Sequence, residues 1–241
     1  MLLETLNPNQ LKAVTTTEGN ILILAGAGSG KTRVLVQRIS YLINQKNICP
    51  TSILGLTFTN KAAEEMRQRV AKIIGKKKAS TIHLMTFHSF CMKILKSEIH
   101  HLGFTSKFTL YDEKDIKRLI QFITCEITGS NDLPIDPVVQ GVSQLKNKGS
   151  LLNDKKLLPT ESIDKLIFDV YKALDTALRA YNALDFDSLL TKTMELFLTF
   201  PKILEKYQDI FKYIMIDEYQ DTNPVQYQIS KLLSEKNGNL C

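Results

Sequence analysis

Ile21-Leu-Ile-Leu-Ala-Gly-Ala-Gly-Ser-Gly-Lys-Thr32 is the stretch from which the fold can be predicted. Its four apolar residues, Ile21 to Leu24, predict a short buried strand, and the apolar spacing after Lys31 predicts a helix. A glycine-rich turn joins the two. Strand, turn and helix in this order, with Gly-Lys-Thr at the helix start, are typical of a loop that binds a nucleoside triphosphate.

Each residue type in this loop suits a triphosphate. Gly26, Gly28 and Gly30 allow successive backbone N–H groups to turn inward toward an anion, and the helix N-terminus adds its positive dipole end. Lys31 is expected to reach the β- and γ-phosphates, and the Thr32 hydroxyl to ligate Mg²⁺. The predicted nucleotide-binding residues of the loop are Ala25 (where the usual pattern has glycine), Gly26, Ala27, Gly28, Ser29, Gly30, Lys31 and Thr32.

Composition and charge narrow the class of protein. The chain has 241 residues, 44% hydrophobic and 23% charged, which is ordinary for one large or two modest globular domains. Residues 1–100 carry 14 Lys/Arg against 5 Asp/Glu, so this part has the positive field, which suits a polyanionic partner as well as a solvated basic face. The four cysteines form no Cys-x-x-Cys pair, and no apolar run approaches a membrane span. A soluble, cytoplasmic protein with no membrane partner is expected.

Residues on both sides of the loop are further candidates. Gln10 stands at the third position of a helix that Asn7 can cap, so its amide either completes a capping box or reads an adenine edge. Strands are predicted at 52–57 and 82–86, and a parallel sheet with covering helices follows from this rhythm. Phe58, just after one strand, is either core or a platform that stacks on a base. His88 lacks nearby ligands for a metal, and Gly75-Lys-Lys-Lys78 is either a solvated turn or a phosphate contact.

The chain changes character between 93 and 183. Amphipathic helical stretches at 115–127 and 162–182 are separated by polar connectors, with no alternating strand pattern. We therefore predict an inserted all-helical subdomain at 93–183, and an α/β core made of 1–92 and 184–241.

A second apolar run, Tyr213 to Ile216, ends in Asp217 and Glu218. Carboxylates at the end of a parallel strand face the crevice where a phosphate loop lies. Asp217 is therefore expected to hold Mg²⁺ and Glu218 to accept a proton from the attacking water. Asn223 is predicted to cap the helix that follows.

Taken together and in this order, these motifs resemble the N-terminal part of the UvrD/Rep/PcrA-type superfamily 1 DNA helicases. The resemblance implies a RecA-like P-loop NTPase core, ATP and Mg²⁺ as cofactors, single-stranded DNA and a duplex junction as partners, and 3′-to-5′ unwinding. The motifs that carry it are Leu6-Asn-Pro-Asn-Gln10, Ala25 to Arg33, Thr57-Phe-Thr-Asn-Lys-Ala-Ala63, Thr86-Phe-His-Ser89, Leu184-Asp-Phe-Asp187 and Ile216-Asp-Glu-Tyr-Gln-Asp-Thr-Asn223.

The resemblance also implies residue roles. Gln10 would contact adenine, Arg33 would pack near it, and Gln220 would lie in the motif of Asp217 and Glu218. Lys31, Asp217 and Glu218 would be catalytic. The residues that would contact DNA are Thr57, Phe58 (stacked on a base), Asn60, Thr86, Phe87, His88, Lys76, Lys77 and Lys78.

The family pattern continues beyond Cys241 into a Gly-Asp-x-x-Gln-Ser-Ile-Tyr segment and a second motor domain. The chain is therefore expected to be half a motor, binding ATP and DNA with little turnover. Three alternatives stay open: a nucleotide- and DNA-binding module, a subunit of a helicase–nuclease, and, more remotely, a phosphotransferase.

Overall fold

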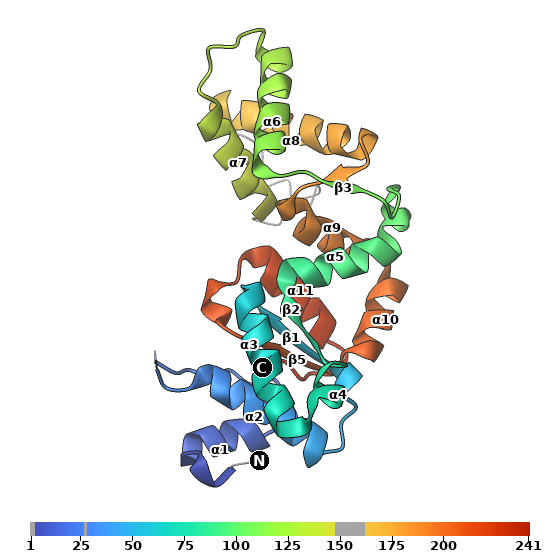
Figure 1. The fold of residues 1–241 in the computed structure, drawn as a ribbon. Helices are drawn as coiled ribbons and strands as arrows, with labels where there is room; N and C mark the ends of the chain where they lie inside the picture. Colours follow the sequence, from blue (N-terminus) through green and yellow to red (C-terminus); the bar gives the residue numbers. More distant parts are fainter. Residues whose placement is uncertain (1–2, 27, 148–161) are drawn as a thin grey trace. The chain divides into compact units, whose positions relative to one another are not determined.

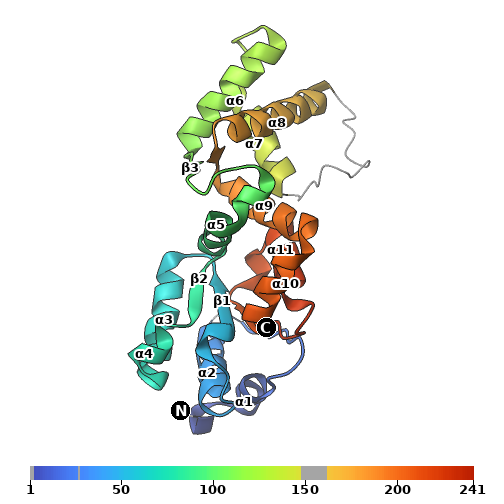
Figure 2. The ribbon, with the colours of Figure 1, turned by 90° about the vertical axis from the view of Figure 1, so that its right-hand side faces the viewer.

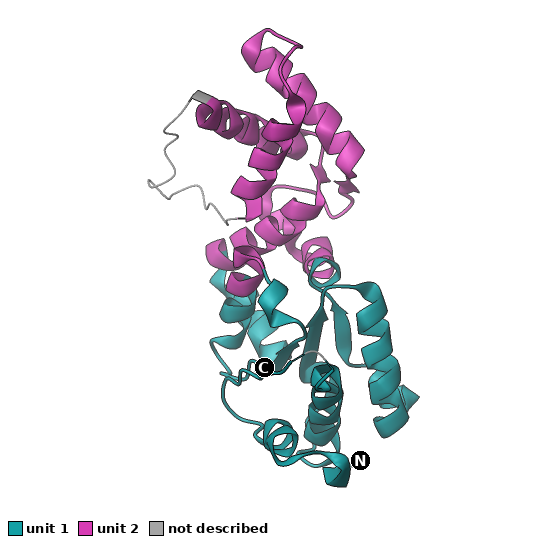
Figure 3. Cartoon of the chain, turned by 90° about the vertical axis from the view of Figure 1, so that its left-hand side faces the viewer, with its two compact units in different colours: residues 1–90, 200–222, 229–241 teal, residues 91–199, 223–228 magenta. Residues whose placement is uncertain are grey.

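The computed structural model describes residues 3–26, 28–147 and 162–241, and they form two compact units (Figure 3). Unit 1 comprises 1–90, 200–222 and 229–241, and unit 2 comprises 91–199 and 223–228. The division falls within two helices, α5 (Phe87–Glu98) and α11 (Pro224–Ser234). The boundaries predicted from the sequence, 1–92 with 184–241 and 93–183, stay a prediction.

Unit 1 is built on a parallel three-stranded sheet in the order β2-β1-β5 (Figure 1). Its strands are β1 (Ile53–Thr57), β2 (His83–Thr86) and β5 (Tyr213–Ile216). Thr57 pairs with Thr86, and Leu56 pairs with Ile216, so the three carboxyl ends are level with one another. The predicted parallel α/β fold is confirmed.

Helices cover both faces of this sheet. α2 (Lys31–Asn44) and α3 (Asn60–Ile74) contribute to one apolar core with β1 and β2, while α10 (Pro201–Ile210) lies on the other side (Figure 2). Gly55 of β1 faces this core, and a Cβ added to it would lie 2.4 Å from the Leu84 side chain. The glycine therefore leaves room for the Leu84 side chain. The shorter elements are η1 (Leu3–Thr5), α1 (Pro8–Thr15), η2 (Pro50–Ser52), α4 (Lys76–Ala79) and η5 (Tyr219–Asp221).

The predicted buried strand at Ile21 to Leu24 is wrong. These residues form no strand, and Leu22 and Leu24 are 66% and 86% exposed. The Ile21 N–H donates to the Leu240 carbonyl oxygen, and Leu240 in turn bridges to Ile214 of β5. Within the described residues, backbone pairing with this part of the sheet stops at Ile21. The side chains of Leu22 and Leu24 therefore stay exposed.

Unit 2 is mainly helical. Its helices are α6 (Glu113–Thr128), α7 (Ile135–Asn147), α8 (Ser162–Ala180) and α9 (Phe186–Thr199), with η3 (Ile99–Leu102). It also contains a parallel pair that the sequence did not predict, β3 (Thr109–Leu110) with β4 (Ala183–Leu184). Among the residues that the structure describes, no helix is both long and apolar enough to cross a bilayer.

Candidate nucleotide and nucleic-acid site

The glycine loop leads directly into α2, as predicted. Gly28 and Gly30 have φ values of +74° and +87°, a conformation that favours glycine. Gly30 is also the residue that precedes the first turn of α2, so the free N–H groups of that turn follow the loop. Gly26 has no positive φ. Ala27 lies outside the described residues.

Two side-chain contacts join the start of α2 to the end of β5. The Lys31 Nζ lies 3.2 Å from the Glu218 Oε2, and the Thr32 hydroxyl donates to the Asp217 Oδ2 at 3.2 Å. The Asp217 N–H donates to the Leu56 carbonyl, which fixes Asp217 beside the end of β1. Residues 185 positions apart in the sequence are thus brought together at the carboxyl edge, as the strand order predicted.

The two acids have opposite electrostatic surroundings. Burial raises the pKa of the Asp217 carboxyl, and the neighbouring charge of Glu218 adds to this, while Thr32 and Lys31 oppose it. A hydrogen bond from Gln220, followed by that from Lys31, lowers the pKa of Glu218. Glu218 is therefore ionised at neutral pH and is held as the anion by two donors.

Glu218 also has an unusual backbone. Its φ and ψ are +52° and +47°, the left-handed region that residues with a side chain rarely adopt. Such strain persists where the surroundings enforce it, often at functional sites. Here the turn η5 follows directly, and the Gln220 Nε2 donates to the Glu218 Oε2 at 2.6 Å. Backbone and amide together orient the Glu218 carboxylate.

The oxygen atoms at this edge fit a magnesium ion. Asp217 is only 7% exposed, and the two donors that reach its carboxylate are the Thr32 hydroxyl and the Glu218 N–H. A buried carboxylate beside a hydroxyl provides the hard oxygen ligands that Mg²⁺ takes, with water and phosphate completing the shell. In the described ranges, no group of three or more His, Cys, Asp or Glu could hold a metal.

Gln10 has the capping role, and it also contacts the glycine loop. Its Oε1 accepts from the Asn7 N–H at 3.1 Å, completing the capping box of α1. Its Nε2 donates to the Ser29 carbonyl of the loop at 3.0 Å, and contact with adenine stays a prediction. Arg33, in the first turn of α2, donates to the hydroxyl and carbonyl oxygens of Thr5.

The residues expected to contact DNA fall into two groups. Thr57 and Thr86 are neighbours at the ends of β1 and β2, and the Thr86 hydroxyl donates to Ser89 at 2.9 Å. Phe58 is partly exposed, with its ring centroid 6.0 Å from that of Phe87. Phe87 itself is 1% exposed, so one side of the Phe58 ring packs against a buried ring. Asn60 is exposed and His88 partly so, both within the first turn of a helix that starts at this edge.

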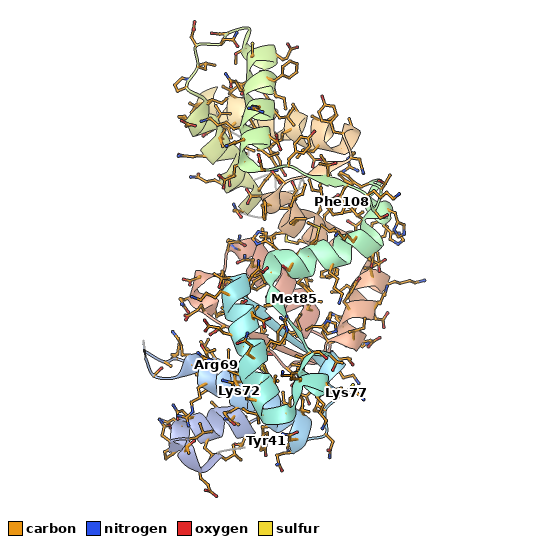
Figure 4. All side chains as sticks on the ribbon, viewed as in Figure 1. Tyr41, Arg69, Lys72, Lys77, Met85 and Phe108 are labelled. Atoms are coloured by element: carbon orange, nitrogen blue, oxygen red, sulfur yellow. The ribbon has the colours of Figure 1, made fainter. Side chains whose placement is uncertain are left out.

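The structure does not bring the lysines of α4 to this edge. α3 starts at the carboxyl end of β1 and runs 15 residues, or about 22 Å, before α4 begins. β2 then starts at its amino end, so Lys76, Lys77 and Lys78 lie at the opposite edge of the sheet from Thr86. Figure 4 shows Lys77 well apart from Met85, the residue before Thr86. All three lysines are exposed.

Sequence reasoning gave no role to two features. Arg38 of α2 is buried together with its helical neighbours Val34, Leu35 and Ile39. Its position in this apolar register was the sequence signal that could have predicted its burial. In unit 2, the Lys146 Nζ lies 2.6 Å from the Asp185 Oδ2 and is 4% exposed, so the Leu184-Asp-Phe-Asp motif includes a buried ion pair. The predicted cap at Asn223 is present, and the Gln226 side chain completes it as a capping box.

Comparisons with known proteins agree with this geometry. Residues 6–241 match the family model of the UvrD/REP helicase N-terminal domain. The chain is 43% identical over its whole length to a Staphylococcus aureus protein named ATP-dependent DNA helicase PcrA, and 42% identical to that of Staphylococcus epidermidis. In both cases it covers 33% of the relative, so the chain spans about a third of the length of these curated relatives. The chain therefore belongs to the UvrD/REP helicase N-terminal domain family.

Proposed function

We propose that this chain is the ATP·Mg²⁺- and single-stranded-DNA-binding part of an ATP-dependent helicase that moves 3′ to 5′, and that alone it turns over slowly. The observation that carries the proposal is the pair of contacts from Lys31 to Glu218 and from Thr32 to Asp217. These contacts support the proposal because they join, at 3.2 Å each, the side chains expected to bind phosphate, to hold the metal and to act as the base. The relatives' printed name, ATP-dependent DNA helicase, supports the same reading.

The roles follow from the chemistry of each group. Lys31 neutralises the terminal phosphates and so has to leave Glu218, its partner in this structure. Glu218 then accepts a proton from the attacking water, with Gln220 keeping the carboxylate oriented. Thr32 and Asp217 would hold Mg²⁺, which when bound neutralises charge on the phosphate oxygens.

Nucleotide binding would also engage Gln10. The amide of Gln10 uses one lone pair of its oxygen on Asn7 and one N–H on Ser29. Its second N–H and second lone pair would serve for adenine. Arg33, bonded to Thr5 beside the same helix, would lie close to the base.

For DNA, we propose that Thr57, Asn60, Thr86 and His88 line the strand and that Phe58 stacks on a base. The half-buried ring of Phe58, backed by Phe87, resembles a platform more than a core residue. The lysines of α4 would contact a different stretch of phosphate backbone, because they lie at the other edge of the sheet. They are not part of the track formed by Thr57 and Thr86.

Slow turnover is expected from the charge that develops on the transferring phosphoryl group. An arginine that stabilises this charge is worth about 10³–10⁵ in rate in related enzymes. The cation beside Glu218 is a lysine, Lys31. Arg33, which is near it in the sequence, donates to Thr5 instead, so it is not placed to stabilise this charge. From a typical turnover of about 10 per second, the chain would be left with about 10⁻² per second or less.

The test is a coupled ATPase assay on the purified chain with and without single-stranded DNA. Glu218→Gln controls for contaminating ATPase. DNA-stimulated turnover above about one per second that disappears in Glu218→Gln would refute slow turnover and favour a self-sufficient motor. Binding of ATP without any turnover would favour the alternative, a nucleotide- and DNA-binding module.

A further inference from the structure

Arg38 is a buried arginine in the helix that follows the glycine loop. It is 2% exposed, and its guanidinium donates to backbone carbonyls just beyond the end of α1 and within it. The Nη1 donates to Ala13 at 2.7 Å and to Thr16, and the Nη2 donates to Thr17 at 3.3 Å. The Nε is buried without a hydrogen-bond partner in the described structure. Burying a charged group in this way is costly, so a role that needs the charge is expected.

These hydrogen bonds are important for the position of α1, because the helix buries few apolar side chains. The helix has eight residues, and Val14 is its one buried residue. The apolar contribution to its docking is therefore small. The last carbonyls of a helix have no partner within the helix, and a cation there is favoured by the helix dipole. Arg38 satisfies one such carbonyl, at Ala13, and two just after it.

The same helix carries Gln10 near its other end. Gln10 and Thr16 are six residues apart, which is about 9 Å along a helix. Arg38 and the glycine loop are separated by a similar distance along α2, since Lys31 and Arg38 are seven residues, or about 10 Å, apart. α1 is therefore held to the loop and α2 at two places, by Gln10 on Ser29 and by Arg38 on the carbonyls.

We propose that Arg38 is a positioning residue for base recognition: it holds the end of α1 so that Gln10 faces the base of a bound nucleotide. The inference rests on the proposed nucleotide-binding function. Arg38 does not touch the nucleotide, and it acts through Gln10. Burial lowers the pKa of the Arg38 guanidinium, and Cys241, Tyr213 and Glu18, when ionised, oppose this.

The experiment compares two ligands that differ only in possessing a nucleoside. Dissociation constants for ATP·Mg²⁺ and for inorganic tripolyphosphate·Mg²⁺ are measured by calorimetry on the full chain, its Arg38→Lys and Arg38→Met variants, and Gln10→Ala. The ratio of the two constants reports the contribution of the base. In both Arg38 variants we expect the ATP preference to fall about three- to tenfold, the size of one hydrogen bond, with tripolyphosphate affinity unchanged. Arg38→Lys, which keeps the charge, should lose less.

Two further measurements separate positioning from general destabilisation. Ile39→Val, on the same helix but in the sheet-facing core, should lower the melting temperature without changing the ratio. Hydrogen exchange of the backbone amides of α1 without nucleotide should be faster in both Arg38 variants and unchanged in Ile39→Val. Combining Arg38→Lys with Gln10→Ala should cost no more base preference than Gln10→Ala alone.

Each outcome has one meaning. A wild-type chain that binds neither ligand, or both equally, refutes the proposed nucleotide function. The role of Arg38 is refuted if the wild-type chain prefers ATP and the Arg38 variants keep this preference. It is also refuted if these variants lose affinity for tripolyphosphate as much as for ATP. Additive losses in the double variant also refute it, because Arg38 would then act independently of Gln10.

Discussion

Replacing Glu218 with glutamine should tighten nucleotide binding, although it removes the expected base. In the structure the Glu218 Oε2 forms an ion pair with the Lys31 Nζ at 3.2 Å. A triphosphate therefore has to compete with Glu218 for this cation. Glutamine keeps an oxygen that can accept the bond from Gln220, so the loop itself should change little. The expected gain is the free energy of the ion pair that no longer needs to be broken.

The size of that gain follows from exposure. The side chains of Lys31 and Glu218 are 30% and 43% exposed, and ion pairs as open as this contribute about 0.2–1 kcal/mol. Nucleotide affinity should therefore rise about 1.4- to 5-fold. Because salt screens exposed charges, the gain should shrink as ionic strength rises from about 0.05 M to about 0.5 M.

The assay is titration with a fluorescent ATP analogue at both salt concentrations. Glu205→Gln is the matched control, since it makes the same change of net charge and removes the exposed ion pair of Glu205, in α10, with Lys236. Lys31→Ala should bind nucleotide far more weakly, and adding Glu218→Gln to it should give a smaller gain than in the wild type. Weaker binding in Glu218→Gln, or an equal gain in the Lys31→Ala background, would refute the competition.

Two other predictions concern Asp217 and the residues proposed to contact DNA. Because burial raises the Asp217 pKa, the folded state binds this proton more tightly than the unfolded state, so the ionised carboxylate costs stability as pH rises through the raised pKa. Asp217→Asn should therefore melt at a higher temperature than wild type at pH 7 in EDTA, and this difference should disappear below about pH 4. The variant should also lose Mg²⁺-dependent nucleotide affinity. An equal or lower melting temperature at pH 7 would contradict the stability prediction. Phe58→Ala should weaken single-stranded DNA binding by about 1–3 kcal/mol at an unchanged salt slope, whereas neutralising Lys76, Lys77 and Lys78 together should reduce the log–log slope by at most about 2; the same salt signature in both variants would show that the division of roles is wrong.

Local chemistry made part of this structure predictable. The capping boxes of Asn7 with Gln10 and of Asn223 with Gln226 depend on residues three apart, and both are present. The helix starting at Lys31 and the strand ending before Asp217 were also found, since glycine turns and apolar runs are local signals.

What could not be predicted depends on neighbours distant in sequence. Whether Leu22 and Leu24 are buried is decided by what lies beside them, and their own apolar character could not supply this. The DNA contact of Lys76 to Lys78 stays a prediction, but only the direction of α3 shows that they lie at the edge of the sheet opposite Thr86. Arg38 fitted the apolar register, yet only the carbonyls at the end of α1 explain why a charge is buried there.

Gly55 lies in the same strand as Thr57, one of the residues proposed to line the DNA strand. It is two residues before Thr57, and the Leu84 side chain of β2 takes the space that a side chain at Gly55 would need. Because backbone hydrogen bonds set the distance between paired strands, a larger residue at Gly55 would first displace Leu84 within the core and leave Thr57 and Thr86 paired. A mutational survey would therefore classify Gly55 as a folding position, although it lies only two pairs from the proposed DNA-contacting threonines.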